Sequence, residues 1–122
     1  MFTLTADLVV MIHDEALNPG ELAGLAMNKS LEGALGRVEN RIVYGLISDI
    51  YDLAAAYAIA SAQGHCVNDT NKRTAFRSMQ VCLEGNGIAA EMSALEIGPV
   101  IIRAAQGLLD EGELAHWLRT HI

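Results

Sequence analysis

The amino-acid sequence predicts an all-α fold, a compact bundle of about six helices. Apolar residues recur at intervals of three and four along most of the chain, as they do on the buried face of a helix. Glycine, proline and asparagine gather in short stretches between these segments, where they end helices. Hydrophobic residues make up 52% of the 122 residues and charged residues 19%, a balance typical of a folded protein. We expect a single domain over residues 1–122.

The first helix is predicted to end near Ala16, because the Asn-Pro-Gly sequence at residues 18–20 breaks a helix. A surface loop follows, and the helical period restarts after Ser30, which we interpret as an N-cap. The apolar residues that place one face of the first helix in the core are Leu4, Leu8, Val9 and Ile12.

A long helix is predicted over residues 31–62, since the apolar period continues through Ile42, Leu46 and Ile50 into an alanine-rich run. Its C-terminal part is apolar almost all round, so we expect this helix to be the central and most buried one. The aromatic residues interpreted as part of its core are Tyr44, Tyr51 and Tyr57.

Three further helices are expected after Gly64 and a polar loop at residues 65–70. The first of them ends in the Gly-Asn-Gly of residues 85–87, since these residue types accept the left-handed conformation of a helix C-terminus. Its core residues are predicted to be Ala75, Met79, Cys82 and Leu83. The next helix opens with the capping-box pair Ser93 and Glu96, although a proline such as Pro99 is tolerated only in the first turn of a helix. The last helix is predicted over residues 113–118, with Trp117 turned toward the core.

The charge and the cysteine count exclude several classes of protein. Eight Lys and Arg against 15 Asp and Glu give a formal net charge of −7, which argues against a nucleic-acid partner. Residues 1–10 do not resemble a secretory signal, and two cysteines do not make a disulfide framework. No apolar stretch reaches the roughly 20 residues that a membrane-spanning helix needs. We therefore expect a cytoplasmic protein without a membrane partner.

Residues that carry chemistry concentrate between His65 and Arg77. Lys72, Arg73 and Arg77 lie at the predicted start of a helix, where unpaired backbone N–H groups and the helix dipole favour an anion such as phosphate. His65 titrates near neutral pH, and Asp69 supplies an oxygen ligand suited to Mg²⁺. A base, a metal ligand and phosphate donors in one short stretch are typical of phosphoryl or nucleotidyl transfer.

Residues 65–74, His-Cys-Val-Asn-Asp-Thr-Asn-Lys-Arg-Thr, resemble the signature loop of the Fic/Doc family in its Doc form, H-x-F-x-D-x-N-K-R-T. The similarity begins at residues 31–35 and continues to the Glu-Gly-Asn-Gly of residues 84–87, and it implies the Fic/Doc fold. Val67 replaces the phenylalanine of the motif, and Thr70 occupies a position for a small residue.

Lys72 and Phe76 separate this sequence from the broader Fic pattern, H-P-F-x-x-G-N-G-R-x-x-R, whose members transfer AMP. That pattern has glycine at the position of Lys72 and its second arginine at the position of Phe76. The resemblance to Doc toxins implies instead that the nucleotide binds in the reverse sense, so that the γ-phosphate is transferred.

By this resemblance the chain is expected to be the toxin of a toxin–antitoxin module. It would be a protein kinase that uses ATP and Mg²⁺, phosphorylates a threonine of translation elongation factor Tu and arrests translation, with a cognate antitoxin as partner. The catalytic residues implied are His65, Asp69, Lys72 and Arg73, with Asp69 as the metal ligand. The residues implied for nucleotide binding are Asn68, Asn71, Lys72, Arg73 and Arg77.

Alternatives stay open at this point. The chain could be a Fic-like AMP transferase, or a non-catalytic binding module that kept the loop and lost activity through Val67. Asp69 alone could be a helix cap, and Arg73 with Arg77 could be a solvated face, although like charges four residues apart destabilise a helix unless an anion lies nearby. A zinc site lacks the usual ligand spacing; it would use His65 and Asp69 with His13 or His116.

Overall fold

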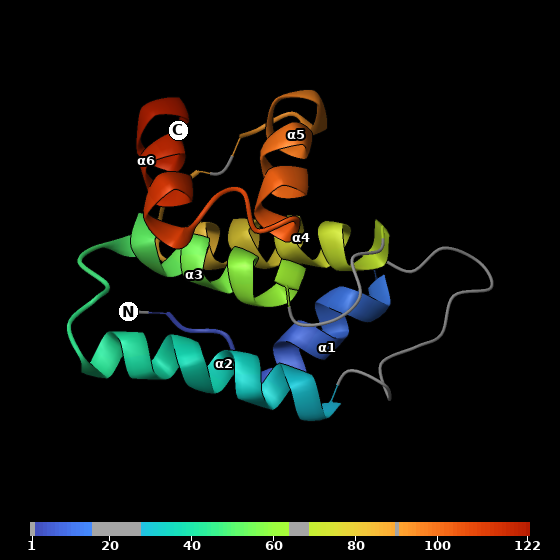
Figure 1. Ribbon diagram of the computed structural model, residues 1–122, viewed down its shortest axis with the longest axis vertical. Coiled ribbons are helices and arrows are strands. Elements are labelled where there is room, and N and C mark those ends of the chain that lie inside the picture. The colour runs from blue at the N-terminus through green and yellow to red at the C-terminus, as the bar shows by residue number, and fades with distance from the viewer. Residues whose placement is uncertain (1, 16–27, 64–68, 90) are drawn as a thin grey trace.

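In the computed structural model the described residues are 2–15, 28–63, 69–89 and 91–122, and they form six helices and no strand (Figure 1). The predicted all-α fold is therefore confirmed. No helix among these residues has the length and apolar character needed to cross a bilayer. The helices are α1 (Ala6–Glu15), α2 (Asn28–Val43), α3 (Ile50–Gln63), α4 (Asp69–Gly85), α5 (Ala94–Ala105) and α6 (Glu111–His121).

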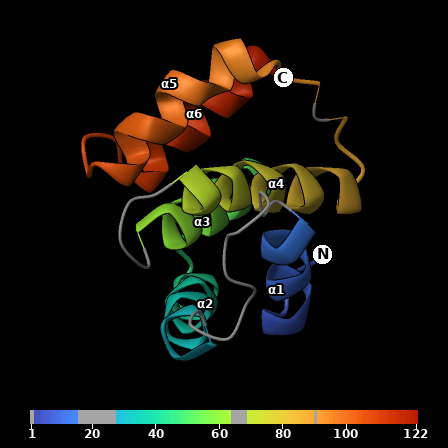
Figure 2. The same ribbon diagram turned by 90° about the vertical axis from the view of Figure 1, so that its right-hand side faces the viewer.

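The helices form three layers. Helices α3 and α4 lie side by side in the middle, with α1 and α2 on one side and α5 and α6 on the other (Figure 2). The α3–α4 pair is the most extensively packed in the molecule. Every residue from 53 to 59 of α3 is buried, four of them alanines whose small side chains allow close packing. The prediction that the alanine-rich helix is the central one is confirmed.

The prediction of one continuous helix over residues 31–62 is wrong, because a turn separates α2 from α3. Gly45 takes a φ of +72°, and its N–H donates to the Ile42 carbonyl at 3.1 Å. The Leu46 N–H donates to the Arg41 carbonyl at 2.9 Å. This pair of bonds is a Schellman motif, which ends a helix and favours glycine at the left-handed position. The apolar period runs across the turn and therefore conceals it.

The starts of the first two helices also differ from the prediction. Helix α2 begins at Asn28, so Ser30 lies in its first turn and is not the N-cap. Leu4 is buried as expected, but it packs from the segment before α1. The Thr5 hydroxyl accepts a hydrogen bond from the Leu8 N–H at 3.2 Å, so α1 starts directly after Thr5.

The aromatic residues divide between core and surface. Tyr57 is buried and Tyr51 half-buried, whereas Tyr44 follows the last residue of α2 and is 77% exposed, so its placement in the core is wrong. Trp117 is half-buried at the edge of the core, where its ring stacks on that of His121 with centroids 4.1 Å apart. The face of α6 that is fully buried consists of Leu114, Ala115 and Leu118.

The predictions for α4 and α5 are largely confirmed. Helix α4 ends at Gly85, and Gly87 takes the left-handed conformation with a φ of +84°. The Ser93 side chain caps α5 by accepting a hydrogen bond from the Glu96 N–H at 3.2 Å, although Pro99 lies beyond the first turn of that helix. The predicted core residues of α4 are all fully buried: Ala75, Met79, Cys82 and Leu83.

Candidate functional site

The candidate site is centred on the start of α4, at the end of the molecule where α3 finishes (Figure 1). Helix α4 begins at Asp69, so the backbone of residues 69–72 forms its first turn. Arg73 and Arg77 are the two predicted site residues whose side chains the structure describes. The others lie outside the described residues: His65 and Asn68 entirely, and Asp69, Asn71 and Lys72 in their side chains.

Helix α4 has a buried face and an outward face. Thr74 and Ser78 are fully buried with the apolar residues of the helix, whereas Arg73 is half-buried and Arg77 exposed. Asp69, Arg73 and Arg77 follow one another at intervals of four, so their positions lie along one face of the helix. The Arg77 guanidinium donates to the side-chain oxygen of Gln80 at 2.7 Å. The basic side chains described on this face are therefore the half-buried Arg73 and the exposed Arg77.

This arrangement has the electrostatic character of an anion site. The first backbone N–H groups of a helix lack intrahelical partners, and the macrodipole makes that end positive. Two guanidinium groups within the next two turns add positive charge in a chain whose net charge is −7. Phosphate groups bind at such helix starts.

A clamp at the opposite end of α4 fixes the helix to the N-terminal segment. The Asn86 side chain accepts from the Phe2 N–H at 2.7 Å and donates to the Phe2 carbonyl at 2.9 Å and the Cys82 carbonyl at 2.8 Å. The Tyr57 hydroxyl on α3 accepts from the Leu4 N–H at 3.0 Å. Burial raises the pKa of Tyr57, so the hydroxyl stays neutral. These bonds attach the N-terminal segment both to α3 and to the end of α4.

Cys82 is a core residue, as predicted. Its side chain is fully buried, and this burial raises the pKa of the thiol to about 12, although a hydrogen bond from Asn86 opposes the shift. A thiol in this state is neither a nucleophile nor a metal ligand.

The described residues give the zinc alternative no support. No group of three or more His, Cys, Asp or Glu side chains in that part of the chain could hold a metal ion. His116, one of the ligands considered, is exposed on α6. The side chains of His65, Asp69 and His13 lie outside the described residues.

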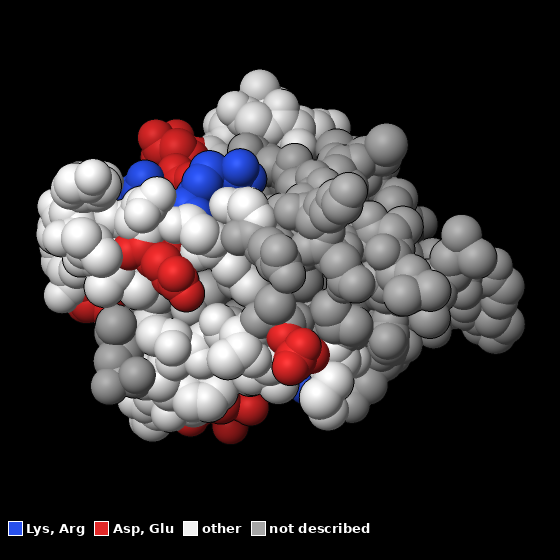
Figure 3. Space-filling view, turned by 90° about the horizontal axis from the view of Figure 1, so that it is seen from below, with Lys and Arg blue, Asp and Glu red and all other residues white. Residues whose placement is uncertain are grey.

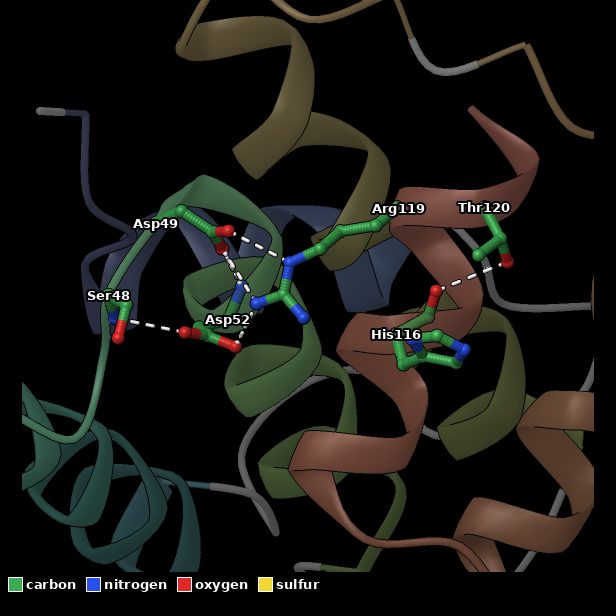
Figure 4. A network of polar contacts seen from close by, with 6 residues as sticks. All are labelled: Ser48, Asp49, Asp52, His116, Arg119 and Thr120. Carbon is green, nitrogen blue, oxygen red and sulfur yellow. Dashed lines mark hydrogen bonds and ion pairs between the residues drawn. The ribbon is translucent and has the colours of Figure 1, made fainter.

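An ion-pair network joins the start of α3 to α6 (Figure 4). Arg119 donates from Nε to Asp49 at 2.9 Å and from Nη2 to Asp52 at 2.6 Å. Asp52 also accepts from the Ser48 N–H at 2.9 Å. The hydrogen bond from Arg119 holds the pKa of Asp49 below its ordinary value. The partners are about 70 residues apart in sequence, so no local pattern announces the network.

A second cluster of basic residues, also missed, lies on α2. Arg37 and Arg41 line a pocket of about 280 Å³ between α2, α3 and the first residue of α6. Figure 3 views the molecule from the side of α2, and most of the visible Lys and Arg gather there in one patch beside acidic residues. The four-residue spacing of the two arginines was the available signal, and it matches that of Arg73 and Arg77.

The helical fold and the sequence of residues 65–74 together define the class of protein as Fic/Doc. Those residues have the Doc form of the family signature and lead into the central helix α4. The chain is similar to the Protein kinase doc of Escherichia phage P1, with 32% identity over 117 residues. The aligned region covers 95% of this chain and 92% of that protein. The chain therefore belongs to the Doc toxins of the Fic/Doc family. No protein-family model matches it.

Proposed function

We propose that the chain is a toxin kinase that transfers the γ-phosphate of ATP, with Mg²⁺, to a threonine of translation elongation factor Tu and so arrests translation. The observation that carries the proposal is the Doc form of residues 65–74, with Lys72 where the AMP-transferring proteins have glycine. It is supported by the similarity to a protein named a kinase. The proposed partner is a cognate antitoxin, and the proposed location is the cytoplasm.

The described part of the site fits a nucleoside triphosphate. A helix start at Asp69 leaves backbone donors for phosphate oxygens, and Arg73 and Arg77 lie on the outward face of the next two turns. Bound Mg²⁺ neutralises phosphate charge, and a carboxylate at position 69 is the type of ligand that it takes. A magnesium-bound triphosphate requires such donors and an acid, and their presence in the sequence around this helix start supports the proposal.

In the proposed reaction, His65 takes the proton of the target hydroxyl. The hydroxyl oxygen forms a bond to the γ-phosphorus while the bond from that phosphorus to the β–γ bridging oxygen breaks, and ADP leaves. Lys72 and Arg73 stabilise the charge on the transferring and leaving groups, and Asp69 holds Mg²⁺. The further residues proposed to bind the nucleotide are Asn68, Asn71 and Arg77.

The test is a pair of labelling reactions with Mg²⁺ and purified elongation factor Tu, one with ATP labelled at the γ-phosphate and one with ATP labelled at the α-phosphate. We expect label on the factor only from the γ-phosphate. Label from the α-phosphate would overturn the kinase assignment in favour of AMP transfer. Nucleotide binding without either label, in the factor and in a cell extract, would identify a non-catalytic binding module. A different labelled protein in the extract would retain the kinase and reject the proposed target.

A further inference from the structure

The pocket between α2, α3 and α6 is separate from the candidate site, since none of its lining residues belongs to the motif or to α4. Its volume is about 280 Å³. Alanine and branched side chains of α2 and α3, among them Val38 and Ile59, form an apolar floor. Four polar residues complete the lining: Arg37, Asn40 and Arg41 from α2, and Glu111 from α6.

Arg41 lines this pocket and carries an unpaired Nε that is itself covered and not open to the pocket. A buried donor without an acceptor costs free energy, and most such groups in folded proteins are paired. On the same molecule the guanidinium of Arg119 is paired in the usual way, with two carboxylates. Among the described residues, neither Arg37 nor Arg41 forms an ion pair with a carboxylate.

The spacing of the two arginines also favours an anion at this pocket. Arg37 and Arg41 are one helical turn apart, so their like charges repel across a helix surface unless an anion lies between them. Asn40 contributes an amide donor at the same rim. Guanidinium groups bind carboxylate and phosphate oxygens through paired N–H donors, and the pocket presents two such groups.

The charge of the pocket selects between these two anions. Glu111 offsets one of the two arginine charges, which leaves a formal net charge of +1 in the lining. A carboxylate carries one negative charge, whereas inorganic phosphate approaches two at neutral pH. The apolar floor also suits a hydrocarbon group, which phosphate lacks. We propose that this pocket binds a small organic carboxylate, with its oxygens on Arg41 and Arg37 and its hydrocarbon part against Val38 and Ile59.

The carboxylate can come from a free small molecule or from an acidic group of a bound protein segment, and both present the same chemistry. The proposal does not depend on phosphoryl transfer, because the pocket shares no residue with the proposed catalytic machinery. Failure of one proposal therefore leaves the other intact.

The test is a titration of the ¹⁵N-labelled full chain with 4-methylpentanoate, followed by NMR of the backbone amides. We expect saturable shifts at residues 34–41 and 56–60, and about tenfold weaker binding of 4-methylpentanamide, which has the same shape without the charge. Arg41→Gln should weaken binding of the acid about tenfold. Arg103→Gln, which removes an exposed arginine on α5, should not change it.

Two further variants make the result decisive. Arg37→Gln removes an exposed side chain, so it tests the site without risk to the core, and it should also weaken binding. Glu111→Gln should strengthen binding of inorganic phosphate. Equal binding of the acid and the amide, tighter binding of phosphate than of the acid to the unmutated chain, or wild-type affinity in both arginine variants would overturn the proposal.

A second titration identifies the source of the carboxylate. Its probes are a short acetylated peptide ending in a free leucine carboxylate and the same peptide amidated. Tighter binding of the free-carboxylate peptide than of 4-methylpentanoate supports a protein segment as the ligand. Weaker binding of that peptide, with the acid still bound, supports a free small molecule.

Discussion

Arg37 and Arg41 on α2 have the same four-residue spacing as Arg73 and Arg77 on α4, and their surroundings differ. The α4 pair follows a helix start, where unpaired backbone N–H groups add to the side-chain donors. The α2 pair lies toward the end of a helix, with Arg41 in the last turn, where the backbone N–H groups are already bonded and the helix dipole is negative. An acid from α6 lines the same pocket. This difference is why we propose a highly charged triphosphate at the α4 start and an anion of one charge in the α2 pocket. Spacing alone does not distinguish two such sites; the position in the helix does.

The largest effect that separates the two regions is expected from His65→Ala. Loss of a general base lowers transfer by about 10²- to 10⁴-fold. Unfolding by urea should be unchanged, because the sequence predicts His65 in a polar loop and not in the core. The measurement is the rate of γ-phosphate transfer under saturating ATP. The matched control is His116→Ala, which removes an exposed histidine of α6. Near-normal transfer by folded His65→Ala would refute the proposed mechanism.

Substitution of one arginine in each pair tests whether the two pairs belong to separate sites. Arg73→Gln should lower transfer by about tenfold or more, because it removes a charged donor to the phosphates. Arg37→Gln should leave transfer unchanged and weaken carboxylate binding in the α2 pocket. Steady-state transfer and the NMR titration, run on both variants, give the four values required. A loss of transfer in Arg37→Gln as large as that in Arg73→Gln would mean that the two pairs serve one site.

Lys72→Gly tests whether Lys72 sets the orientation of the triphosphate at the start of α4. An ammonium in the first turn occupies space that glycine would leave to a phosphate, so it should decide which end of the triphosphate enters. We expect several-fold slower phosphorylation and weak AMP transfer, measured by the mass of the group added to the target. Glycine also lowers helix stability by up to about 1 kcal/mol, so Lys72→Ala serves as the control for the loss of charge. Phosphorylation at the parental rate by Lys72→Gly would contradict the role of Lys72.

Much of the fold was predictable because apolar period and breakers coincide along most of the chain. The clearest failure, the continuous helix through residues 42–50, arises where the two signals conflict. Ile42, Leu46 and Ile50 keep the period, while the single Gly45 turns the chain. Tyr44 was misplaced for the same reason. One continuous helix would have placed Tyr44 in the core, but α2 ends at Val43 and Tyr44 is exposed.

The candidate site was predictable in part, because its residues are contiguous and match a motif. The structure confirms the predicted helix, which begins at Asp69, whereas the roles of all the predicted site residues stay predictions. The spacing of Arg37 and Arg41 was visible in the sequence, but the α2 pocket and the Arg119 network were not. Each brings together residues from distant segments: the packing of α2 and α6 on α3 forms the pocket, and the packing of α6 on α3 forms the network.

The smallest expected effect concerns an arginine whose partners lie within the chain. Arg119 lowers the pKa of Asp49, so its contribution to stability is present above the unfolded-state pKa of that carboxyl and is lost as the pH falls through the lower folded-state value. The Arg119 and Asp49 side chains are each more than a third exposed, so loss of that ion pair in Arg119→Gln should cost less than about 1 kcal/mol at neutral pH. The same variant also removes the pair with the less exposed Asp52. The part of this cost that comes from Asp49 should disappear as the pH falls below the lowered folded-state pKa and the carboxyl becomes protonated. Urea unfolding at neutral pH and along an acid series measures it.

Arg41→Gln is the matched comparison for Arg119→Gln. Arg41 makes no ion pair with a described carboxylate. Without ligand, Arg41→Gln should therefore leave the pH dependence of the free energy of unfolding unchanged. Addition of 4-methylpentanoate should stabilise the unmutated chain and not Arg41→Gln, because a ligand that binds only the folded state raises its stability. Arg41→Gln could instead change the pH dependence of the free energy of unfolding as much as Arg119→Gln does. That result would show that a carboxylate of the chain pairs with Arg41 in solution, and it would contradict the proposal that Arg41 binds an external anion.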